Sequence, residues 1–320
     1  MPHPHHQAVV ARRFGAPPEV LRLEDLPTPE LGPGEARVRM IASPINPSDL
    51  IPVTGAYASR TDLPFVPGFE GVGVVEKVHE AADQALLGRR VLPVGFAGGW
   101  QQQKVTPLEW LIPVPDGLSD EQAATAYINP LTAIRMVEAH ANPATKRAVV
   151  DAAGSAIAPI IAHLLKARGI EVIGLVRTAR RLDTSLFDQV LPTCHPDWER
   201  ALGSVDVAFD CVGGDLGTRL GRLLSPGGAL VHYGLLSGAP LDPTLWEERP
   251  DITVDLFRLR GWVHGVDKQS LHDAFATAFG LIREDAIRTN VQASFPLGEF
   301  ARAIELATAF GSNGKVLLQP

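Results

Sequence analysis

The sequence predicts an α/β protein in which a doubly wound parallel sheet is joined to a second, β-rich domain. Three observations support this prediction. Residues 147–177 have the pattern of a strand, a tight turn, a helix and a second strand. Residues 8–40 alternate short strand-like runs with Pro and Gly turns. The chain has 320 residues, which exceeds the usual length of one domain, so we expect two.

The stretch 147–177 is the clearest local signal. The apolar run Ala148–Val150 is short enough for a strand buried on both faces. Apolar residues then recur at helical spacing from Ile157 to Leu165, and Gly169 stands where a helix would stop. Val172–Val176 is a second apolar run. Together these segments predict a βαβ unit whose turn opens a helix.

The turn of this unit is a candidate phosphate site. Residues 152–156 are all small, so an anion can approach the unpaired N–H groups at the helix start. The glycine fingerprint of such sites is degraded, because only Gly154 remains. From this stretch alone, a close helix–strand crossing without a ligand explains the turn equally well. The candidate cofactor-binding residues are Gly154, Ser155, Ala156 and Ile157.

The end of the second strand indicates which dinucleotide would bind. NAD sites usually place Asp or Glu there to hold the ribose hydroxyls. This chain has Arg177, with Arg180 nearby. A guanidinium binds phosphate in a bidentate manner, so it suits a 2′-phosphate. The sequence therefore favours NADPH over NADH, and the alternative is a solvated basic turn.

Composition excludes several classes of protein. Hydrophobic residues make up 45% and charged residues 20%, which are ordinary globular values. A net charge of −7 argues against nonspecific nucleic-acid binding. No apolar run has the length of a membrane span, and the N-terminus lacks the apolar segment of a signal peptide. Two cysteines make a disulfide framework improbable. We expect a soluble cytoplasmic protein with no nucleic-acid or membrane partner.

Further elements follow from local patterns. A helix is predicted from Leu118 to His140, with Ser119 as N-cap. Ligands of a doubly wound sheet bind beyond the carboxyl ends of its strands. Gly213 and Gly234 are therefore candidates for close backbone approach to the cofactor. A plain turn explains each glycine equally well. His232 and Tyr233 are expected to be satisfied core side chains. The remaining predicted elements are strands at Ala36–Ile41, Val190–Leu191, Val205–Val212, Pro226–Gly234 and Lys315–Leu318, and helices at Gln269–Ile287 and Phe295–Phe310.

Two motifs of the N-terminal part resemble a known family. They are Ile45-Asn46-Pro47-Ser48-Asp49, followed by Gly55-Ala56-Tyr57, and Gly68-Phe69-Glu70-Gly71-Val72-Gly73. Both resemble the medium-chain dehydrogenase/reductase superfamily, whose members join a GroES-like domain to a Rossmann nucleotide-binding domain. The resemblance implies a discontinuous GroES-like domain, 1–120 with 266–320, and a Rossmann domain, 121–265.

The same resemblance implies further assignments. Related proteins place residues that face the cofactor at Asn129–Ala133, which makes Thr132 a candidate nicotinamide contact. Leu259–Trp262 corresponds to the sixth strand of the cofactor domain. Because that strand often pairs across a dimer in this superfamily, we expect a homodimer.

The zinc ligands of the superfamily are missing. Zinc members have Gly-His-Glu where this chain has Gly68-Phe69-Glu70, and a Cys near the position of Asn46. A structural zinc would need four closely spaced cysteines, and Cys194 and Cys211 are the only two. The resemblance therefore points to a branch without a metal and disfavours a zinc alcohol dehydrogenase.

Within that branch, the motif ending in Tyr57 looks most like the mitochondrial trans-2-enoyl-CoA/ACP reductases. In that family the motif tyrosine is the proposed proton donor, which implies this role for Tyr57; Asn46, at the former ligand position, would orient substrate or water. The implied reaction is NADPH-dependent reduction of the C=C bond of a 2-enoyl thioester, with hydride reaching the β carbon and a proton the α carbon. The alternatives are a quinone or enone reductase, and a protein that binds NADPH without turnover.

Overall fold

The computed structural model describes residues 5–178, 185–309 and 314–320. The chain forms two compact units. The first unit is Met1–Ile128 with Val263–Pro320, and the second unit is Asn129–Trp262. The domain boundaries predicted above, at 120 and 266, stay a prediction.

The second unit is built on a six-stranded sheet in which every neighbouring pair is parallel. Its strand order is β10-β9-β8-β11-β12-β13, which is the doubly wound order 3-2-1-4-5-6. Val149, Ile173 and Leu230 are fully buried in its core. The predicted Rossmann fold is thereby confirmed. The strands are β8 (Arg147–Val150), β9 (Glu171–Val176), β10 (Gln189–Pro192), β11 (Val205–Asp210), β12 (Leu224–His232) and β13 (Thr253–Leu256).

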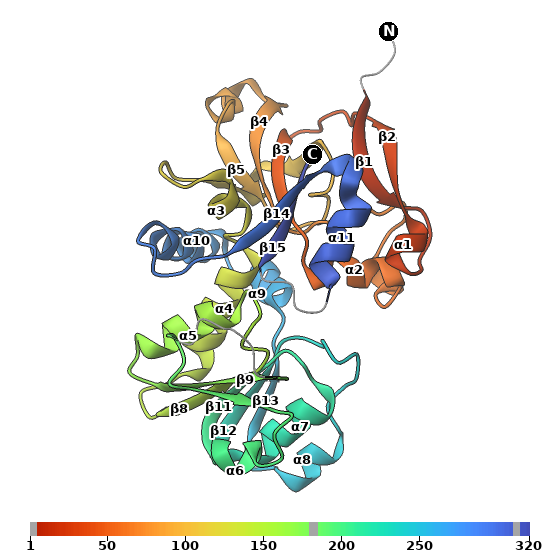
Figure 1. The fold of residues 1–320 in the computed structure, drawn as a ribbon. Helices are drawn as coiled ribbons and strands as arrows, with labels where there is room; N and C mark the ends of the chain where they lie inside the picture. The colour runs from red at the N-terminus through yellow and green to blue at the C-terminus, as the bar shows by residue number, and fades with distance from the viewer. Residues whose placement is uncertain (1–4, 179–184, 310–313) are drawn as a thin grey trace. The chain divides into compact units, whose positions relative to one another are not determined.

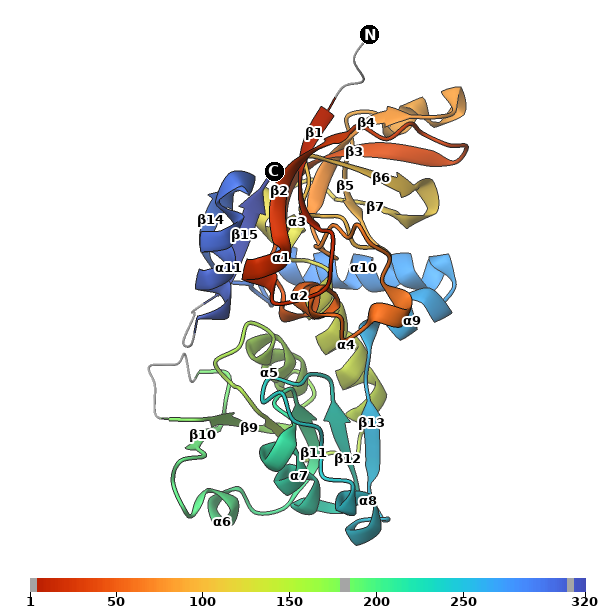
Figure 2. The same cartoon turned by 90° about the vertical axis from the view of Figure 1, so that its right-hand side faces the viewer.

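Helices cover both faces of this sheet (Figures 1 and 2), with α5 on one side and α6, α7 and α8 on the other. The apolar stripe of α5 is buried as its spacing predicts, including Ile160, Ile161 and Leu165. Covering both faces explains why the strands are continuous apolar runs. The helices are α5 (Ala158–Lys166), α6 (Trp198–Leu202), α7 (Gly214–Arg222) and α8 (Thr244–Glu248), with α4 (Ile128–His140) preceding β8.

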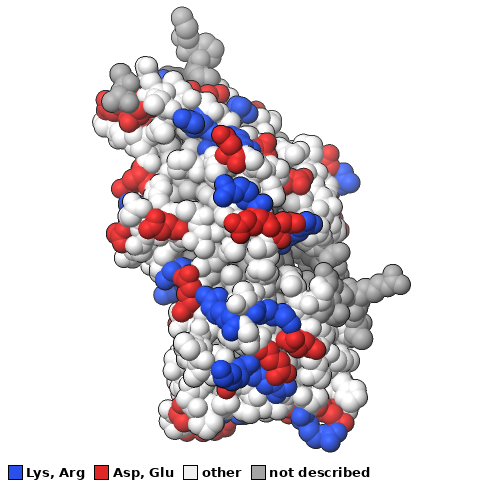
Figure 3. Space-filling model, turned by 90° about the vertical axis from the view of Figure 1, so that its left-hand side faces the viewer, with Lys and Arg blue, Asp and Glu red and all other residues white. Residues whose placement is uncertain are grey.

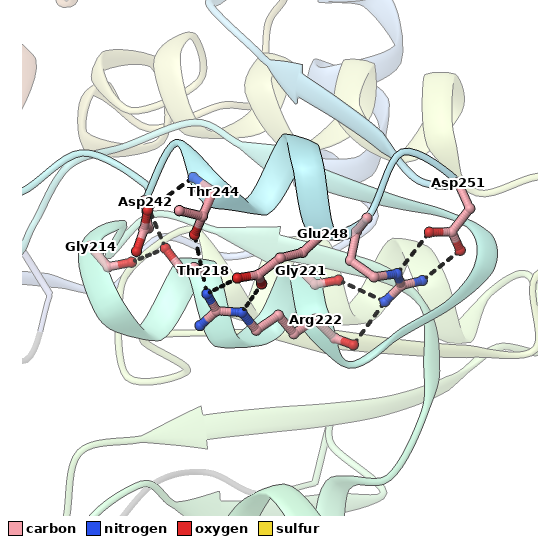
Figure 4. A network of polar contacts seen from close by, with 9 residues as sticks. Gly214, Thr218, Gly221, Arg222, Asp242, Thr244, Glu248 and Asp251 are labelled. Atoms are coloured by element: carbon pink, nitrogen blue, oxygen red, sulfur yellow. Dashed lines mark hydrogen bonds and ion pairs between the residues drawn. The ribbon is translucent and has the colours of Figure 1, made fainter.

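Polar contacts fix α7 against the segment of α8 (Figure 4). The Arg222 guanidinium donates to both carboxylate oxygens of Glu248, at 2.6 and 3.1 Å. The Thr218 hydroxyl donates to the Gly214 carbonyl at 2.8 Å and accepts the Asp242 N–H at 2.9 Å. Because α7 begins at Gly214, the Thr218 contacts hold the first turn of this helix just after the carboxyl end of β11, and the Arg222 contacts hold its last turn.

The first unit is β-rich. A seven-stranded sheet has the path β14-β15-β3-β4-β5-β7, with β6 also paired to β3, and β1 pairs with β2. β15 runs antiparallel to β3, which places the C-terminal segment in the N-terminal sheet (Figure 1). The strands are β1 (His5–Ala11), β2 (Leu21–Pro27), β3 (Glu35–Pro44), β4 (Val72–Val78), β5 (Arg90–Pro93), β6 (Gln103–Pro107), β7 (Leu111–Pro113), β14 (Val291–Pro296) and β15 (Lys315–Gln319). The helices are α1 (Pro17–Val20), α2 (Pro47–Thr54), α3 (Asp120–Ala124), α10 (Lys268–Arg283) and α11 (Phe300–Thr308), with 3₁₀ turns η1 (Ala58–Arg60), η2 (Ala81–Leu86), η3 (Leu108–Trp110) and η4 (Leu297–Glu299).

The prediction of a sixth strand at Leu259–Trp262 is wrong. The sixth strand is β13, whose residues Thr253–Leu256 pair with Ala229–His232. Leu259–Gly265 forms the helix α9. Leu259 and Val263 are both buried and lie four residues apart, which is a helical and not a strand repeat.

Two helix predictions also need correction. The segment 118–140 is not one helix, because α3 ends at Ala124 and α4 begins at Ile128. Between them the N–H groups of Tyr127 and Ile128 donate to Glu70 and not to carbonyls of a continuing helix. The N-cap at Ser119 is confirmed, since its hydroxyl accepts the Gln122 N–H at 3.1 Å.

The predicted helix at Phe295–Phe310 begins five residues later. Phe295 lies in β14 and pairs with Leu318 of β15, so this segment satisfies its backbone groups in the sheet. The helix α11 starts at Phe300. Phe310 lies outside the described residues.

Charged side chains of both signs are interspersed on the face drawn in Figure 3. That face shows no broad field of one sign of the kind that nucleic-acid binders present. In the part of the chain that the structure describes, no helix has the length and apolar character needed to cross a membrane.

Candidate active site

The turn between β8 and α5 has the geometry of an anion site. Ala152 adopts a positive φ of 42°, a left-handed conformation that is uncommon for a non-glycine residue. The Ala153 N–H donates to the Leu175 carbonyl at 2.8 Å, and the Ser155 N–H to the Ala152 carbonyl at 2.7 Å. These two bonds close the turn and pin it to β9.

Several donors of this turn have no partner among the residues that the structure describes. Among the described residues, the N–H groups of Gly154, Ala156 and Ile157 make no backbone hydrogen bond. The Ser155 hydroxyl oxygen is buried and also lacks a hydrogen-bond partner there. Buried polar atoms are rarely left unpaired, so an unpaired hydroxyl beside free N–H groups at a helix start indicates a site for an external acceptor. The structure thus brings together the four residues that the sequence singled out.

The other cofactor candidates lie at strand ends of the same unit. Arg177 directly follows β9 and is exposed. Arg180 lies outside the described residues. Gly213 has a φ of +69° and donates its N–H to Asp210 at 2.8 Å, so its glycine is required by the turn itself. Thr132 is buried in α4.

Gly234 follows β12 and is a glycine for a packing reason. A Cβ there would lie 2.8 Å from the Cys211 carbonyl oxygen. A close approach to a neighbouring strand therefore accounts for this glycine, and its assignment to the cofactor stays a prediction.

A buried acid pair organises the same edge of the sheet, and sequence reasoning missed it. Asp151 follows β8 and accepts the Cys211 N–H at 2.9 Å, while Asp210 ends β11 and accepts Nδ1 of His232 at 2.6 Å. Burial and the neighbouring Asp210 raise the pKa of Asp151 well above its ordinary value. Burial also acts to raise the pKa of Asp210, but hydrogen bonds led by that from His232 outweigh it and lower the pKa. Asp151 is therefore the protonated partner, and the pair shapes the turn that leads into α7.

His232 ends β12 and Tyr233 follows it, and both were expected to be core side chains with satisfied hydrogen bonds. His232 is satisfied by Asp210, as expected. The buried Tyr233 hydroxyl, in contrast, has no partner that meets hydrogen-bond geometry among the described residues. An acidic residue at the carboxyl end of each of two buried strands was the available sequence signal for this network.

Tyr57 lies in the first unit, between α2 and η1. Its side chain is 37% exposed. The Arg60 guanidinium stacks on its ring at 4.0 Å from the ring centroid. Such a cation–π contact fixes the ring while leaving the phenol hydroxyl open to a ligand.

Asn46 lies at the opposite end of α2 from Tyr57. The helix has eight residues, so the two predicted catalytic residues are separated by about 12 Å of helix rise. Asn46 is only 2% exposed. The structure therefore does not bring these two side chains together, and Asn46 is engaged elsewhere.

Asn46 belongs to a buried polar cluster with Asp49, Glu70 and Lys315. Its Nδ2 donates to Glu70 at 3.0 Å, its N–H donates to Asp49 at 2.7 Å, and Nζ of Lys315 donates to its Oδ1. Glu70 also accepts the N–H groups of Tyr127 and Ile128, at 2.9 and 2.8 Å. Glu70 and Lys315 were not singled out from the sequence, because nothing local pairs residues so far apart.

Burial dominates the acid–base behaviour of this cluster. It raises the pKa of Asp49 from 3.8 to about 7, against the opposing hydrogen bonds from Phe69 and Asn46. It raises the pKa of Glu70 in the same way, and Lys315 is the largest opposing influence. It lowers the pKa of Lys315, although the two carboxylates favour its charged form.

The buried Asp49 should make the stability of the protein depend on pH. Between about pH 4 and pH 7, folded Asp49 keeps a proton that an unfolded Asp loses, so the folded state binds more protons. The free energy of unfolding should therefore fall as pH rises through this window, by up to about 1.4 kcal/mol per pH unit for this group. Urea denaturation at pH 5, 6 and 7 measures the slope. In Asp49→Asn the slope should become smaller, whatever its absolute stability; an unchanged slope would assign the pH dependence elsewhere.

Comparison with known proteins places this architecture in a class. Residues 32–116 match the alcohol dehydrogenase GroES-like domain, and residues 187–318 match the family described as zinc-binding dehydrogenase. The chain is 30% identical to the mitochondrial enoyl-[acyl-carrier-protein] reductase of Arabidopsis thaliana, over 99% of this chain and 87% of that protein. The bovine enzyme of the same description is 29% identical, over 97% of this chain and 88% of its own length.

Solved structures agree with this assignment. A Bacillus thuringiensis protein described as an NADPH:quinone reductase superposes with a TM-score of 0.92 at 32% identity, over 99% of both chains. The Escherichia coli quinone oxidoreductase, solved in complex with NADPH, superposes with a TM-score of 0.89 at 25% identity, over 98% of this chain and all of that chain. A GroES-like unit joined to a doubly wound nucleotide-binding unit defines a class of oxidoreductases. The chain belongs to that class, the medium-chain dehydrogenase/reductase superfamily, as its motifs indicated.

The zinc in the family's description does not fit the residues of this chain. At the resembling positions, Phe69 offers only a hydrocarbon ring, and both polar atoms of the Asn46 amide are already hydrogen-bonded. The ammonium of Lys315 lies against that amide and would repel a metal cation. Within the described ranges, no group of three or more His, Cys, Asp or Glu residues is arranged to hold a metal ion. A metal ion therefore has no part in the reaction proposed below.

Proposed function

We propose that the protein is an NADPH-dependent reductase of an activated C=C bond, with a 2-enoyl thioester of CoA or acyl-carrier protein as substrate. The observation that carries this proposal is the exposed phenol of Tyr57, held by Arg60 in a motif like that of the enoyl reductases. The 30% identity to an enoyl-[acyl-carrier-protein] reductase over nearly the whole chain supports it. We expect a homodimer located in the cytoplasm.

The second unit has residues suited to hold the cofactor. The N–H groups of Gly154, Ala156 and Ile157 and the Ser155 hydroxyl, which have no partner in the described part of the chain, would bind the pyrophosphate. Arg177, at the end of β9, would bind the 2′-phosphate. When bound, NADPH supplies the hydride that reaches the β carbon of the substrate.

The first unit supplies the proton. As hydride adds to the β carbon, negative charge moves onto the thioester carbonyl, and a proton must then reach the α carbon. A phenol is protonated at neutral pH and can donate. Tyr57 would hold this proton at its hydroxyl, directly or through a water molecule, and a hydride and a proton together saturate the C=C bond.

Arg60 favours a thioester over a neutral acceptor. Among the described residues its guanidinium makes no ion pair, and it stacks on the Tyr57 ring. The carriers of enoyl thioesters bear phosphate groups, which a guanidinium binds well. A quinone has no such group.

A quinone or enone reductase is the second candidate, favoured by the quinone reductase descriptions of the superposed structures. A protein that binds NADPH without turnover is the third. Oxidation of NADPH, followed by its absorbance with crotonyl-CoA, with 1,4-benzoquinone and with neither, separates the three. The proposal expects turnover of crotonyl-CoA; turnover of benzoquinone alone would favour the second candidate, and binding without turnover the third.

Arg177 should determine the choice between the two dinucleotides. Replacing it by Ala removes a charged partner of the 2′-phosphate, so the Kd of NADPH should rise roughly tenfold while that of NADH changes little. Titration of both dinucleotides by fluorescence measures the two constants. Arg147→Ala is a control, since that guanidinium pairs with Glu171 away from the turn. Equal effects on NADPH and NADH would remove the assignment.

A further inference from the structure

Lys315 is a buried lysine without a direct ion pair. It begins β15 and is 8% exposed. Lysine is almost never buried in this way unless a partner holds it. No ion pair joins it to an acid within 4.0 Å in the part of the chain that the structure describes, and its Nζ donates to Oδ1 of Asn46. The Asn46 amide therefore lies between the Lys315 ammonium and Glu70 and is hydrogen-bonded to both.

The chemistry of the amide fixes the direction of this connection. An ammonium can only donate and an ionised carboxylate can only accept. Lys315 therefore donates to Oδ1 of Asn46. This orients Nδ2 of the same amide toward Glu70, to which it donates at 3.0 Å. Glu70 in turn accepts the N–H groups of Tyr127 and Ile128. The result is a continuous relay from ammonium to amide to carboxylate to backbone.

The relay also sets the start of α2. Asp49 joins the N–H of Asn46, at 2.7 Å, to that of Phe69, at 2.8 Å. α2 begins directly after Asn46, and Tyr57 follows its C-terminal end at Gly55. Asp49 and Glu70 are the titratable groups that face Lys315. Without that cation both acids would favour their protonated form more strongly, in which each accepts more weakly from these N–H groups.

We propose that Lys315 is a positioning residue for the reductase reaction: its ammonium is the internal cation that balances Glu70 and Asp49 and so holds α2, and with it Tyr57, in the productive arrangement. The family description assigns zinc to such proteins, and here a side-chain ammonium supplies positive charge to the cluster instead. The activity part of this proposal rests on the proposed function. The stability part does not.

The test compares Lys315→Met, Glu70→Gln and the double variant, with Lys77→Met as the matched control because Lys77 is an exposed lysine of the same unit. With NADPH and crotonyl-CoA, kcat of Lys315→Met should fall at least tenfold, while the Kd of NADPH stays within twofold. The acid limb of its pH profile should move to higher pH, since Glu70 has lost its cation. The double variant should recover at least threefold in kcat, and Lys77→Met should match the wild type.

Thermal unfolding tests the relay independently of any activity. Leaving the buried Glu70 carboxylate without its internal cation should be strongly destabilising, so Tm of Lys315→Met should drop by roughly 5–10 °C at pH 8. The drop should be smaller at pH 5, where the two acids can take up protons, and smaller again in the double variant. If Lys315→Met does not fold alone, a folded double variant supports the relay and an unfolded one contradicts it.

The outcomes separate the two proposals. If the wild type turns over neither crotonyl-CoA nor benzoquinone, the proposed function fails, and the Tm series still decides the relay. If crotonyl-CoA is reduced but Lys315→Met keeps the wild-type kcat and pH profile, the positioning role is overturned. Equal losses in the single and double variants would overturn it as well.

Discussion

Tyr57→Phe should lower kcat for crotonyl-CoA by roughly a hundredfold or more. Loss of a positioned general acid typically costs that much. The substitution removes only the hydroxyl, so the ring contact with Arg60 and the fold should remain. The Kd of NADPH should not change, since the cofactor candidates lie in the other unit. Steady-state kinetics and a fluorescence titration on the same preparation measure both quantities.

Tyr233→Phe is the matched control for this experiment. It is the same substitution at a buried hydroxyl that has no partner meeting hydrogen-bond geometry among the described residues, so it should be neutral or slightly stabilising. Benzoquinone gives a second comparison, because its oxygens can take protons from water. A Tyr57→Phe enzyme with the wild-type kcat for crotonyl-CoA would leave Tyr57 without a chemical role.

Ala156→Asp should raise the Kd of NADPH by about a hundredfold or more. Its carboxylate would stand beside the free N–H groups of Gly154, Ala156 and Ile157, where the pyrophosphate is expected. The new charge would both occupy these donors and repel the phosphates. Isothermal titration with NADPH measures the loss.

Ala156→Asn separates charge from volume in this test. Asn has nearly the size of Asp but no charge, so it should cost much less affinity. If Asp and Asn weaken binding equally, crowding and not electrostatics explains the effect. If Ala156→Asp binds NADPH as the wild type does, the turn is a close helix–strand crossing and not a phosphate site.

The nucleotide-binding half was readable from the sequence because its signals are local. Strand, turn and helix of the unit around Gly154 succeed one another within thirty residues, and each shows its own period. The prediction of the sixth strand was wrong because the apolar pattern of Thr253–Leu256 is weak. Only the pairing of this segment with β12 makes it a strand. A resemblance between short motifs placed the sixth strand at Leu259, where local burial favours a helix.

The polar cluster of the first unit was beyond sequence reasoning for a different reason. Lys315 and Asn46 are 269 positions apart. No local period links two such residues. A lysine that begins an apolar strand is usually expected to be exposed to solvent. The sequence indicated that Asn46 stands where relatives hold a metal, but only the fold shows that Lys315, Glu70 and Asp49 are hydrogen-bonded to it.

The most direct test of the central claim is the mass of the product. Crotonyl-CoA is incubated with the enzyme and NADPH that carries deuterium at the transferred position, in ordinary water. The proposed reaction predicts butyryl-CoA with one added deuterium from the cofactor and one added hydrogen from water, and a second deuterium when the solvent is heavy water. Unchanged crotonyl-CoA, in an assay where the same enzyme oxidises NADPH with benzoquinone, would contradict the enoyl reductase assignment.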